Sequence, residues 1–335
     1  MKGGNTNYLE TNYLNGGIAQ KVNATADVSK NDVLILWDGS KAGTVYHGFE
    51  GALGSTLKVY VPKCSGDFLY QILKKDQDKI YQRYRTPNIP HVIKNFTEKF
   101  IVSIPNVREQ EKIAEFFHDL DSLIALHQRK LEHLQEQKKG LLQKMFPKNG
   151  EVVPEVRFPG FTDAWEQRKL GEVVERFDNL RIPVTSSKRE KGITPYYGAN
   201  GIQDYVQGYT HDGEFVLVAE DGANDLQNYP VHYVNGKVWV NNHAHVLQGK
   251  NKMVDNLFLV NAIKQIKIET YLVGGSRAKL NADVMMKLPI KVPTFNEQQK
   301  IGEYFSKFDT LITLHQRKLD HLELMKKGLL QQMFV

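Results

Sequence analysis

A long internal repeat constrains this chain more than any other feature of its sequence. Residues 105–146 align without a gap to residues 293–334, and 26 of the 42 aligned positions are identical. Shared helical periodicity would preserve apolar character, but it would not preserve the run His-Gln-Arg-Lys that occurs at 127–130 and again at 315–318. The offset of 188 residues is far longer than a solenoid repeat. The chain is therefore predicted to contain two copies of one unit, each a globular module followed by a helix.

Apolar residues recur at alternating steps of three and four along each repeat, which is the spacing of a coiled-coil seam. Pro105 and Pro293 precede the predicted helices and Pro147 ends the first, so each repeat is predicted to be one long helix. Two helices that each carry a single apolar stripe most simply bury those stripes against each other, antiparallel, within one chain. The predicted seam contains Ile113, Phe117, Ile124, Leu131 and Leu134 in the first copy and Ile301, Phe305, Ile312, Leu319 and Leu322 in the second.

Two histidines, His127 and His315, occupy equivalent positions of the two seams. A polar residue inside a seam commonly fixes the register of the helices, and we favour that interpretation. Metal binding or proton transfer by this pair stays open as an alternative.

The segments beside the helices are predicted to be α+β modules. Runs of β-branched residues predict strands at 33–36, 56–61, 215–218 and 237–240, and helices are predicted at 66–84 and 257–268. The predicted fold is thus two α+β modules separated by two long helices in an antiparallel coiled coil, a pseudo-two-fold repeat. The predicted boundaries are 1–103 for the first module, 104–146 for the first helix, 147–154 for a linker, 155–292 for the second module and 293–335 for the second helix.

The two modules resemble each other only faintly. Residues 13–18 are similar to residues 197–202, and residues 36–39 are similar to residues 218–222, whereas the parts nearest the helices differ more. The second module begins with VRFPGFTDAWEQRKLGE, at 156–172, which has no counterpart in the first. Because residue 1 aligns near residue 185, roughly 30 residues lack a counterpart, and a truncated or internally initiated first module is predicted.

Composition excludes several classes of protein. Hydrophobic residues make up 41% and charged residues 24% of the 335 residues, which is typical of globular proteins. The longest apolar run, Val33–Trp37, is far too short to cross a bilayer, so no membrane association is expected. The single cysteine, Cys64, excludes an internal disulfide and a cysteine cluster for zinc, and a cytoplasmic location is predicted. The net charge of +6 permits a polyanionic partner without requiring one.

The duplicated order of module and helix resembles the specificity (S) subunits of type I restriction-modification enzymes across essentially the whole chain. The resemblance rests on two P-x-x-x-E-Q-x-K-I helices, containing Glu109-Gln110 and Glu297-Gln298, on the FPGFTDAWEQRKLGE segment and on the VLVAEDG strand at 216–222. It implies that the modules are target-recognition domains that read a bipartite site in double-stranded DNA, and that the helices act as a spacer ruler. It also implies two methyltransferase subunits as partners and leaves the joining of restriction subunits open. The short first module departs from the family pattern, which puts its independent recognition of DNA in doubt.

The sequence has no G-x-x-x-x-G-K-[ST], no H-E-x-x-H and no methyltransferase N/D-P-P-Y/F motif. We therefore predict a non-catalytic chain without metal or cofactor, and the resemblance places S-adenosylmethionine on the partner. A metal site at His243 and His245, or an acidic nuclease site at Glu220, Asp221 and Asp225, is the less favoured alternative.

Among the predicted DNA contacts Arg85 and Arg277 are the strongest, because arginine pairs bidentately with guanine. The full predicted set is Lys41, Arg83, Arg85 and Asn88 in the first module, and Asn200, Asn224, Asn241, Asn242, His243, Arg277 and Lys279 in the second.

Two other interpretations stay open. The chain could be a nuclease or methyltransferase that acts alone, in which case the isolated chain would show turnover. It could instead be a coiled-coil scaffold that binds its partner and does not bind DNA.

Overall fold

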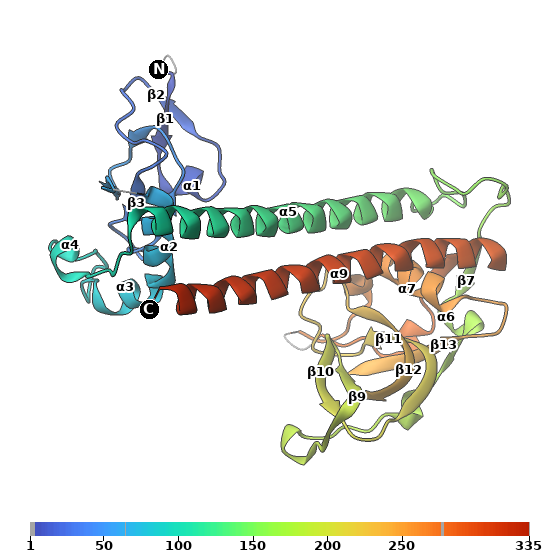
Figure 1. Cartoon of the computed structure of the whole chain (residues 1–335). Helices are drawn as coiled ribbons and strands as arrows, with labels where there is room; N and C mark the ends of the chain where they lie inside the picture. The colour runs from blue at the N-terminus through green and yellow to red at the C-terminus, as the bar shows by residue number, and fades with distance from the viewer. Residues whose placement is uncertain (1–3, 64, 276–277, 335) are drawn as a thin grey trace. The chain divides into compact units, whose positions relative to one another are not determined.

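The computed structural model describes residues 4–63, 65–275 and 278–334. The chain divides into two compact units, of which unit 1 comprises Met1–Lys130 with His315–Val335 and unit 2 comprises Leu131–Leu314. The two repeats form the long helices α5 (Val107–Met145) and α9 (Phe295–Met333), as Figure 1 shows. Each helix passes from one unit into the other, so each unit contains one module and part of both helices.

The two long helices pack antiparallel within each unit. In unit 1 the ring of Phe117 stacks on that of Phe334, with the ring centroids 5.9 Å apart. In unit 2 the rings of Phe305 and Phe146 lie 6.5 Å apart. These are the same two positions of the repeat with the copies exchanged, so the start of each helix meets the end of the other. The predicted fold class is confirmed.

The predicted seam positions lie at or near the helix interface. His127 and His315 meet each other in unit 1, with 3.0 Å between their Nδ1 atoms, as expected for equivalent positions of an antiparallel repeat. Seven predicted seam residues are buried, namely Ile113, Phe117, Leu131, Ile301, Phe305, Leu319 and Leu322, and three are half-buried, namely Ile124, Leu134 and Ile312.

The module of unit 2 is built on a six-stranded sheet with the strand order β10-β9-β12-β11-β13-β8. Its central strand β11 pairs antiparallel with both neighbours, and residues 215–219 are buried, as expected for a strand covered on both faces. Helix α7 covers this sheet, and Trp165 is buried beside it against the rings of Phe146 and Phe258. The elements are β7 (Glu166–Lys169), α6 (Leu170–Val173), β8 (Val174–Arg176), β9 (Lys191–Gly198), β10 (Gly201–Val206), β11 (His211–Ala219), β12 (Val231–Val240), β13 (Ala244–Gly249), α7 (Asn256–Lys264), α8 (Ala282–Met285) and β14 (Pro289–Val292), with 3-10 turns at Asp178–Leu180, Ser186–Lys188 and Ile268–Tyr271.

The module of unit 1 has two three-stranded sheets, with the orders β4-β3-β6 and β2-β1-β5. The first is antiparallel throughout, and its central strand β3 is buried along its whole length. The elements are β1 (Thr6–Leu9), α1 (Thr11–Leu14), β2 (Gln20–Val22), β3 (Val33–Leu36), β4 (Val45–His47), β5 (Ala52–Leu53), β6 (Leu57–Tyr60), α2 (Gly66–Lys75), α3 (Gln77–Arg83) and α4 (Phe96–Lys99).

Both modules attach to the helix pair in the same way. The β4-β3-β6 order of unit 1 corresponds to β12-β11-β13 of unit 2, and α2 corresponds to α7. Phe68 of α2 lies 5.3 Å from Phe334, and Phe258 of α7 lies 5.5 Å from Phe146, measured between ring centroids. The two copies therefore share a common module-to-helix joint in spite of their divergent sequences.

The four strands predicted from the sequence are confirmed as β3, β6 and parts of β11 and β12. The predicted helical segment 66–84 contains two helices, which meet at Asp76, and α7 ends at Lys264, earlier than the predicted 268. No helix among the described residues combines the length and the apolar character needed to span a bilayer.

Candidate nucleic-acid interface

Several predicted contact residues of unit 2 gather around the loop that follows its central strand β11. The backbone N–H of Glu220 donates to the carbonyl of His243 at 2.8 Å, and the backbone carbonyl of Glu220 accepts from the N–H of Leu280 at 2.7 Å. The side chain of Asn200 donates to the carbonyl of Gly222 and accepts from the N–H of Asn224, both at 2.9 Å. We call this surface, residues 199–201, 220–224, 241–243 and 278–280, the second loop cluster.

A network of largely buried ion pairs holds the second loop cluster in place. The two carboxylate oxygens of Glu220 accept from Arg181 and Lys279, each at 2.6 Å. Asp178 pairs with the ring of His245 at 2.7 Å and accepts from the backbone N–H of Val246 at 2.8 Å. Burial raises the pKa of each carboxyl, but these hydrogen bonds outweigh burial and leave the pKa of both acids below its usual range. Both acids are therefore charged near neutral pH and anchor the loop.

The same network contains the one group of possible metal ligands found among the described residues. Ligand atoms of Asp178, Glu220 and His245 lie within 4.8 Å of one another. Cationic side chains already contact both oxygens of Glu220, and His245 Nε2 is bonded to the carbonyl of Leu280 at 2.8 Å. This donor set fits an ion-pair network better than a metal centre, and we propose no metal here.

Asp225 does not join an acidic site either. Its carboxylate accepts from the backbone N–H groups of Gln227 and Asn228 and from the Asn228 side chain, all at 2.9 Å, which closes a local turn. These bonds lower the pKa of Asp225. Asp221 instead contacts His243, with 2.5 Å between Oδ1 and Nδ1.

Unit 1 has a loop cluster of the same design. The N–H of Gly39, after the central strand β3, donates to the carbonyl of Pro90 at 3.1 Å, and Asp38 forms a bridge with His91. Their side chains also pair, with His91 Nδ1 3.1 Å from Asp38 Oδ1. We call residues 38–43 and 83–91 the first loop cluster. In unit 2 the corresponding backbone bridge joins Asp221 to Lys279.

The predicted contact residues differ in their availability. Arg85 is half-buried, and two of the five N–H groups of its guanidinium donate to the carbonyls of Tyr81 and Ser40, at 2.8 and 3.1 Å. Asn241 is only 3% exposed, and its side chain accepts from the N–H of His243, so it does not face solvent. Lys279 is tied to Glu220, and Arg277 lies outside the described residues. The exposed members are Lys41, Arg83, Asn88, Asn200, Asn224, Asn242 and His243.

Sequence reasoning missed the residues that support the loops. Arg181 and Asp178 lie 39 and 67 residues from their partners Glu220 and His245, and no local motif marks them. A weak signal in the sequence pointed to the loops themselves and not to these supporting residues. Residues 36–39 are faintly similar to residues 218–222, which places Asp38 and Asp221 at equivalent positions.

The profile of a known protein family, described as the type I restriction modification DNA specificity domain, matches residues 1–136 and 162–324. The chain belongs to this family. The resemblance predicted from the duplicated helices is thereby confirmed. Membership of the specificity family also supports the prediction of a non-catalytic subunit, which the lack of sequence motifs alone could not establish.

Relatives within the specificity family match different shares of the chain. The type I restriction enzyme MjaVIII specificity subunit of Methanocaldococcus jannaschii is 26% identical over 362 residues, which cover 96% of this chain and 84% of that protein. A putative type I specificity subunit of Haemophilus influenzae is 47% identical over 136 residues, but the match spans only 35% of that protein's length and 41% of this chain. The crystal structure of the type I S subunit from M. genitalium superposes with a TM-score of 0.75 at 17% identity, covering 99% of this chain and 89% of that one.

Proposed function

We propose that this specificity subunit reads a bipartite site in double-stranded DNA with its two loop clusters, while α5 and α9 fix the distance between the half-sites. The proposed recognition domains are residues 1–103 and 155–292, and the proposed ruler is the pair of segments 104–146 and 293–335, with 147–154 as a linker. Because the proposed ligand is double-stranded DNA, we also propose a cytoplasmic location.

The observation that carries the proposal is the repeated loop cluster. In each unit the loop after the central strand is bridged to the segment that returns to the long helix, through Asp38 and His91 in unit 1 and through Asp221 and Lys279 in unit 2. The backbone design is shared, whereas the exposed side chains differ. Different donors and acceptors on a common frame suit two surfaces that read different bases, because base identity is read from hydrogen-bonding groups at the groove edges.

The long helices carry two equivalent apolar surfaces that fit two copies of one partner. Leu123 and Leu126 of α5 are 38% and 42% exposed, and the equivalent Leu311 and Leu314 of α9 are 44% and 60% exposed. Contiguous exposed apolar residues mark interaction sites, and the two leucines of each pair are neighbours on one helix face because they are three residues apart. We propose that each leucine pair binds one methyltransferase subunit, and we assign no surface to restriction subunits. The methyltransferase would bind S-adenosylmethionine and flip the target adenine out of the duplex.

The test maps methylated adenines in cells that carry this chain with its methyltransferase partner. The wild type is expected to give a bipartite motif. Asn224→Ala should relax one half of the motif and Asn88→Ala the other, each by about 1–3 kcal/mol if the side chain makes a bidentate base contact. Gln137→Ala, at an exposed position of α5, is the matched control and should leave the motif unchanged. A continuous motif, or equal relaxation of both halves by one variant, would contradict the proposal.

A further inference from the structure

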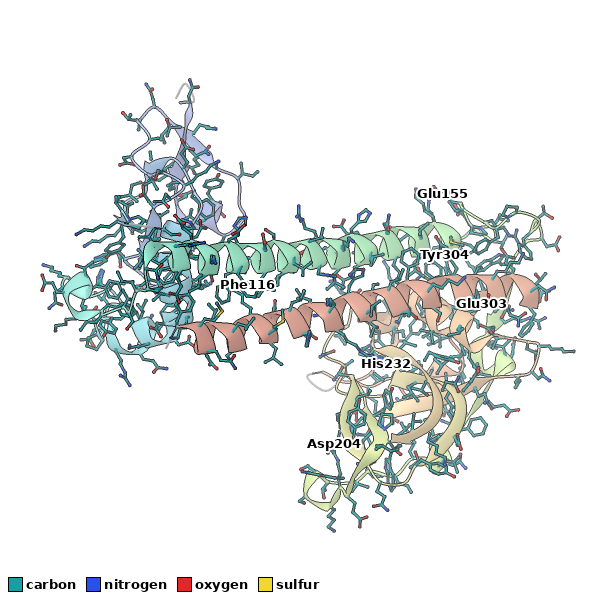
Figure 2. All side chains as sticks on the ribbon, viewed as in Figure 1. Phe116, Glu155, Asp204, His232, Glu303 and Tyr304 are labelled. Carbon is teal, nitrogen blue, oxygen red and sulfur yellow. The ribbon has the colours of Figure 1, made fainter. Side chains whose placement is uncertain are left out.

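In unit 2 a lysine of the module meets a lysine and an aspartate of the helix pair. Lys264 is the last residue of α7, and the helix pair supplies Lys138 and Asp309, whose Nζ and Oδ1 atoms are 2.5 Å apart. These three side chains line an open cavity of about 750 Å³ together with His232. Figure 2 labels His232 on the part of the module nearest α9.

Unit 1 contains the same trio. Lys326 of α9 pairs with Asp121 of α5, again at 2.5 Å, and Lys74 of α2 lines a cavity of about 430 Å³ with both. Lys326 and Asp121 are the repeat equivalents of Lys138 and Asp309. The modules have diverged in sequence, yet each places a lysine at the end of its helix α2 or α7 beside the same pair. We call these the two lysine trios.

Each lysine trio contains a cation without a counterion. One aspartate neutralises one lysine, and within the described part of the chain Lys264 has no hydrogen-bond or ion-pair partner. The amine of Lys74 donates only to the neutral side chain of Gln77, at 3.3 Å. Although Lys264 is exposed as a whole residue, desolvation of its amine lowers its pKa, and the neighbouring Lys138 lowers it further. The pKa of Lys74 is lowered by desolvation and by Lys326. A partly desolvated cation of this kind is stabilised by an anion.

We propose that each lysine trio binds one phosphate of the DNA backbone outside the bases that are read; for unit 1 the proposal rests on the equivalence of its trio to that of unit 2. In unit 2 the cavity adjoins the second loop cluster: Asn200 and Gly201 line a neighbouring cavity of about 530 Å³ together with Lys264 and Asp309, which line both cavities. The loop between β11 and β12 supplies Gln227 and Asn228 to the larger cavity. A duplex bound at the loop cluster therefore brings its backbone beside Lys264. The inference rests on the proposed function and adds sites that do not read sequence.

The test measures binding of cognate duplex to the assembled complex with its methyltransferase, from about 50 to 200 mM salt, where phosphate contacts have their largest effect. The slope of log K against log salt is negative, and each lost phosphate contact reduces its magnitude by about 0.9. Lys264→Gln and Lys74→Gln should each reduce the magnitude of the slope by about that amount, with an unchanged methylation motif, and the double variant should reduce it by about twice as much. Lys264→Arg should keep the wild-type slope.

Two further variants test whether removing a negative charge from the site tightens DNA binding, and whether a lysine outside the site affects the salt slope. Asp309→Asn removes the competing carboxylate and should tighten DNA binding at low salt. Lys287→Gln, at an exposed position that lines neither of the two cavities beside Lys264, should leave the slope unchanged. Circular dichroism and thermal unfolding verify that each variant is folded.

Wild-type slopes in Lys264→Gln and Lys74→Gln would overturn the inference and leave the proposed function intact. Weaker assembly with the methyltransferase at an unchanged salt slope would also overturn it, because the trios would then bind an acidic group of the partner. Failure of the proposed function is a separate outcome: the wild-type complex would show no preference for any DNA sequence.

Discussion

Glu109 and Glu297 occupy the same position in the two copies of the helix, yet their environments differ completely. Glu297 is fully buried and makes a bidentate pair with Arg157, with Nε–Oε1 at 2.7 Å and Nη2–Oε2 at 2.8 Å. Glu109 is exposed, and among the described residues its carboxylate accepts one hydrogen bond, from the side chain of Asn106 at 3.4 Å. The difference arises from residues 155–176, which cover the second copy. The contribution of identical helix residues to stability therefore depends on the module that packs beside them.

The same segment accounts for further contrasts. Phe158 packs on Tyr304 with ring centroids 5.7 Å apart, whereas the equivalent Phe116 is 44% exposed; Figure 2 labels both Phe116 and Tyr304. In unit 2 strands β8 and β7 pair with β13 and β14. Among the described residues of unit 1 the outer edge of β6 has no strand partner, and Ile101 and Ile104 are exposed. The module of unit 1 is therefore expected to be the less stable of the two.

The largest expected effect comes from Arg157→Ala. Removing the cation leaves the carboxylate of Glu297 buried without a counterion, which costs about 3–5 kcal/mol when a buried pair is broken in this way. Glu109→Ala is the matched control at the equivalent exposed position and should change stability by less than about 0.5 kcal/mol. Urea unfolding of both variants measures the contrast, and equal losses would show that the covering segment does not distinguish the copies.

At the helix seam, by contrast, equivalent substitutions in the two copies should reduce stability by equal amounts. Leu131 and Leu319 are repeat equivalents and are 8% and 7% exposed. Truncation of either to alanine should cost about 2–5 kcal/mol, as for other buried leucines. Urea midpoints compared between the two variants test this, and a large cost at one site with none at the other would refute the equivalence of the helices.

The helices were predictable because the repeat and the heptad pattern are local properties of the sequence. The predicted helices, 104–146 and 293–335, differ from α5 and α9 by no more than three residues at each end. The antiparallel packing followed from chain geometry, since each helix leads into or out of a module. Central strands such as β3 were predictable from their continuous β-branched composition.

The candidate site was much less predictable, because its side chains are arranged by contacts distant in sequence. Asn241 looked like a surface residue but is buried, and Arg85 looked free but is bonded to Ser40, 45 residues away. The pair of Arg157 with Glu297 spans 140 residues and has no signature in either segment. Only the three-dimensional arrangement separates exposed contacts from residues that hold the loops.

The smallest expected effect concerns the pH dependence of the helix pair at His127 and His315. Burial lowers the pKa of His127, and His315, Lys130 and Lys318 lower it further. The unfolded chain then takes up a proton at a higher pH than the folded chain, so stability is full above about pH 6.5 and falls as the pH drops through that value. Melting temperatures at pH 7.5 and 5.5 measure the loss. His127→Asn should reduce the pH dependence, and an unchanged dependence would assign it to other groups.

The most direct test of the ruler lengthens both helices where the chain crosses between units, after Lys130 and after Leu314. Four residues in each helix add about 6 Å of rise and about 40° of rotation. One base pair adds about 3.4 Å and about 34°, so rotation favours a spacer longer by one base pair. Methylated adenines mapped in cells that carry the lengthened chain should show both half-sites unchanged and the spacer lengthened by one base pair. An unchanged spacer with unchanged half-sites would contradict the account.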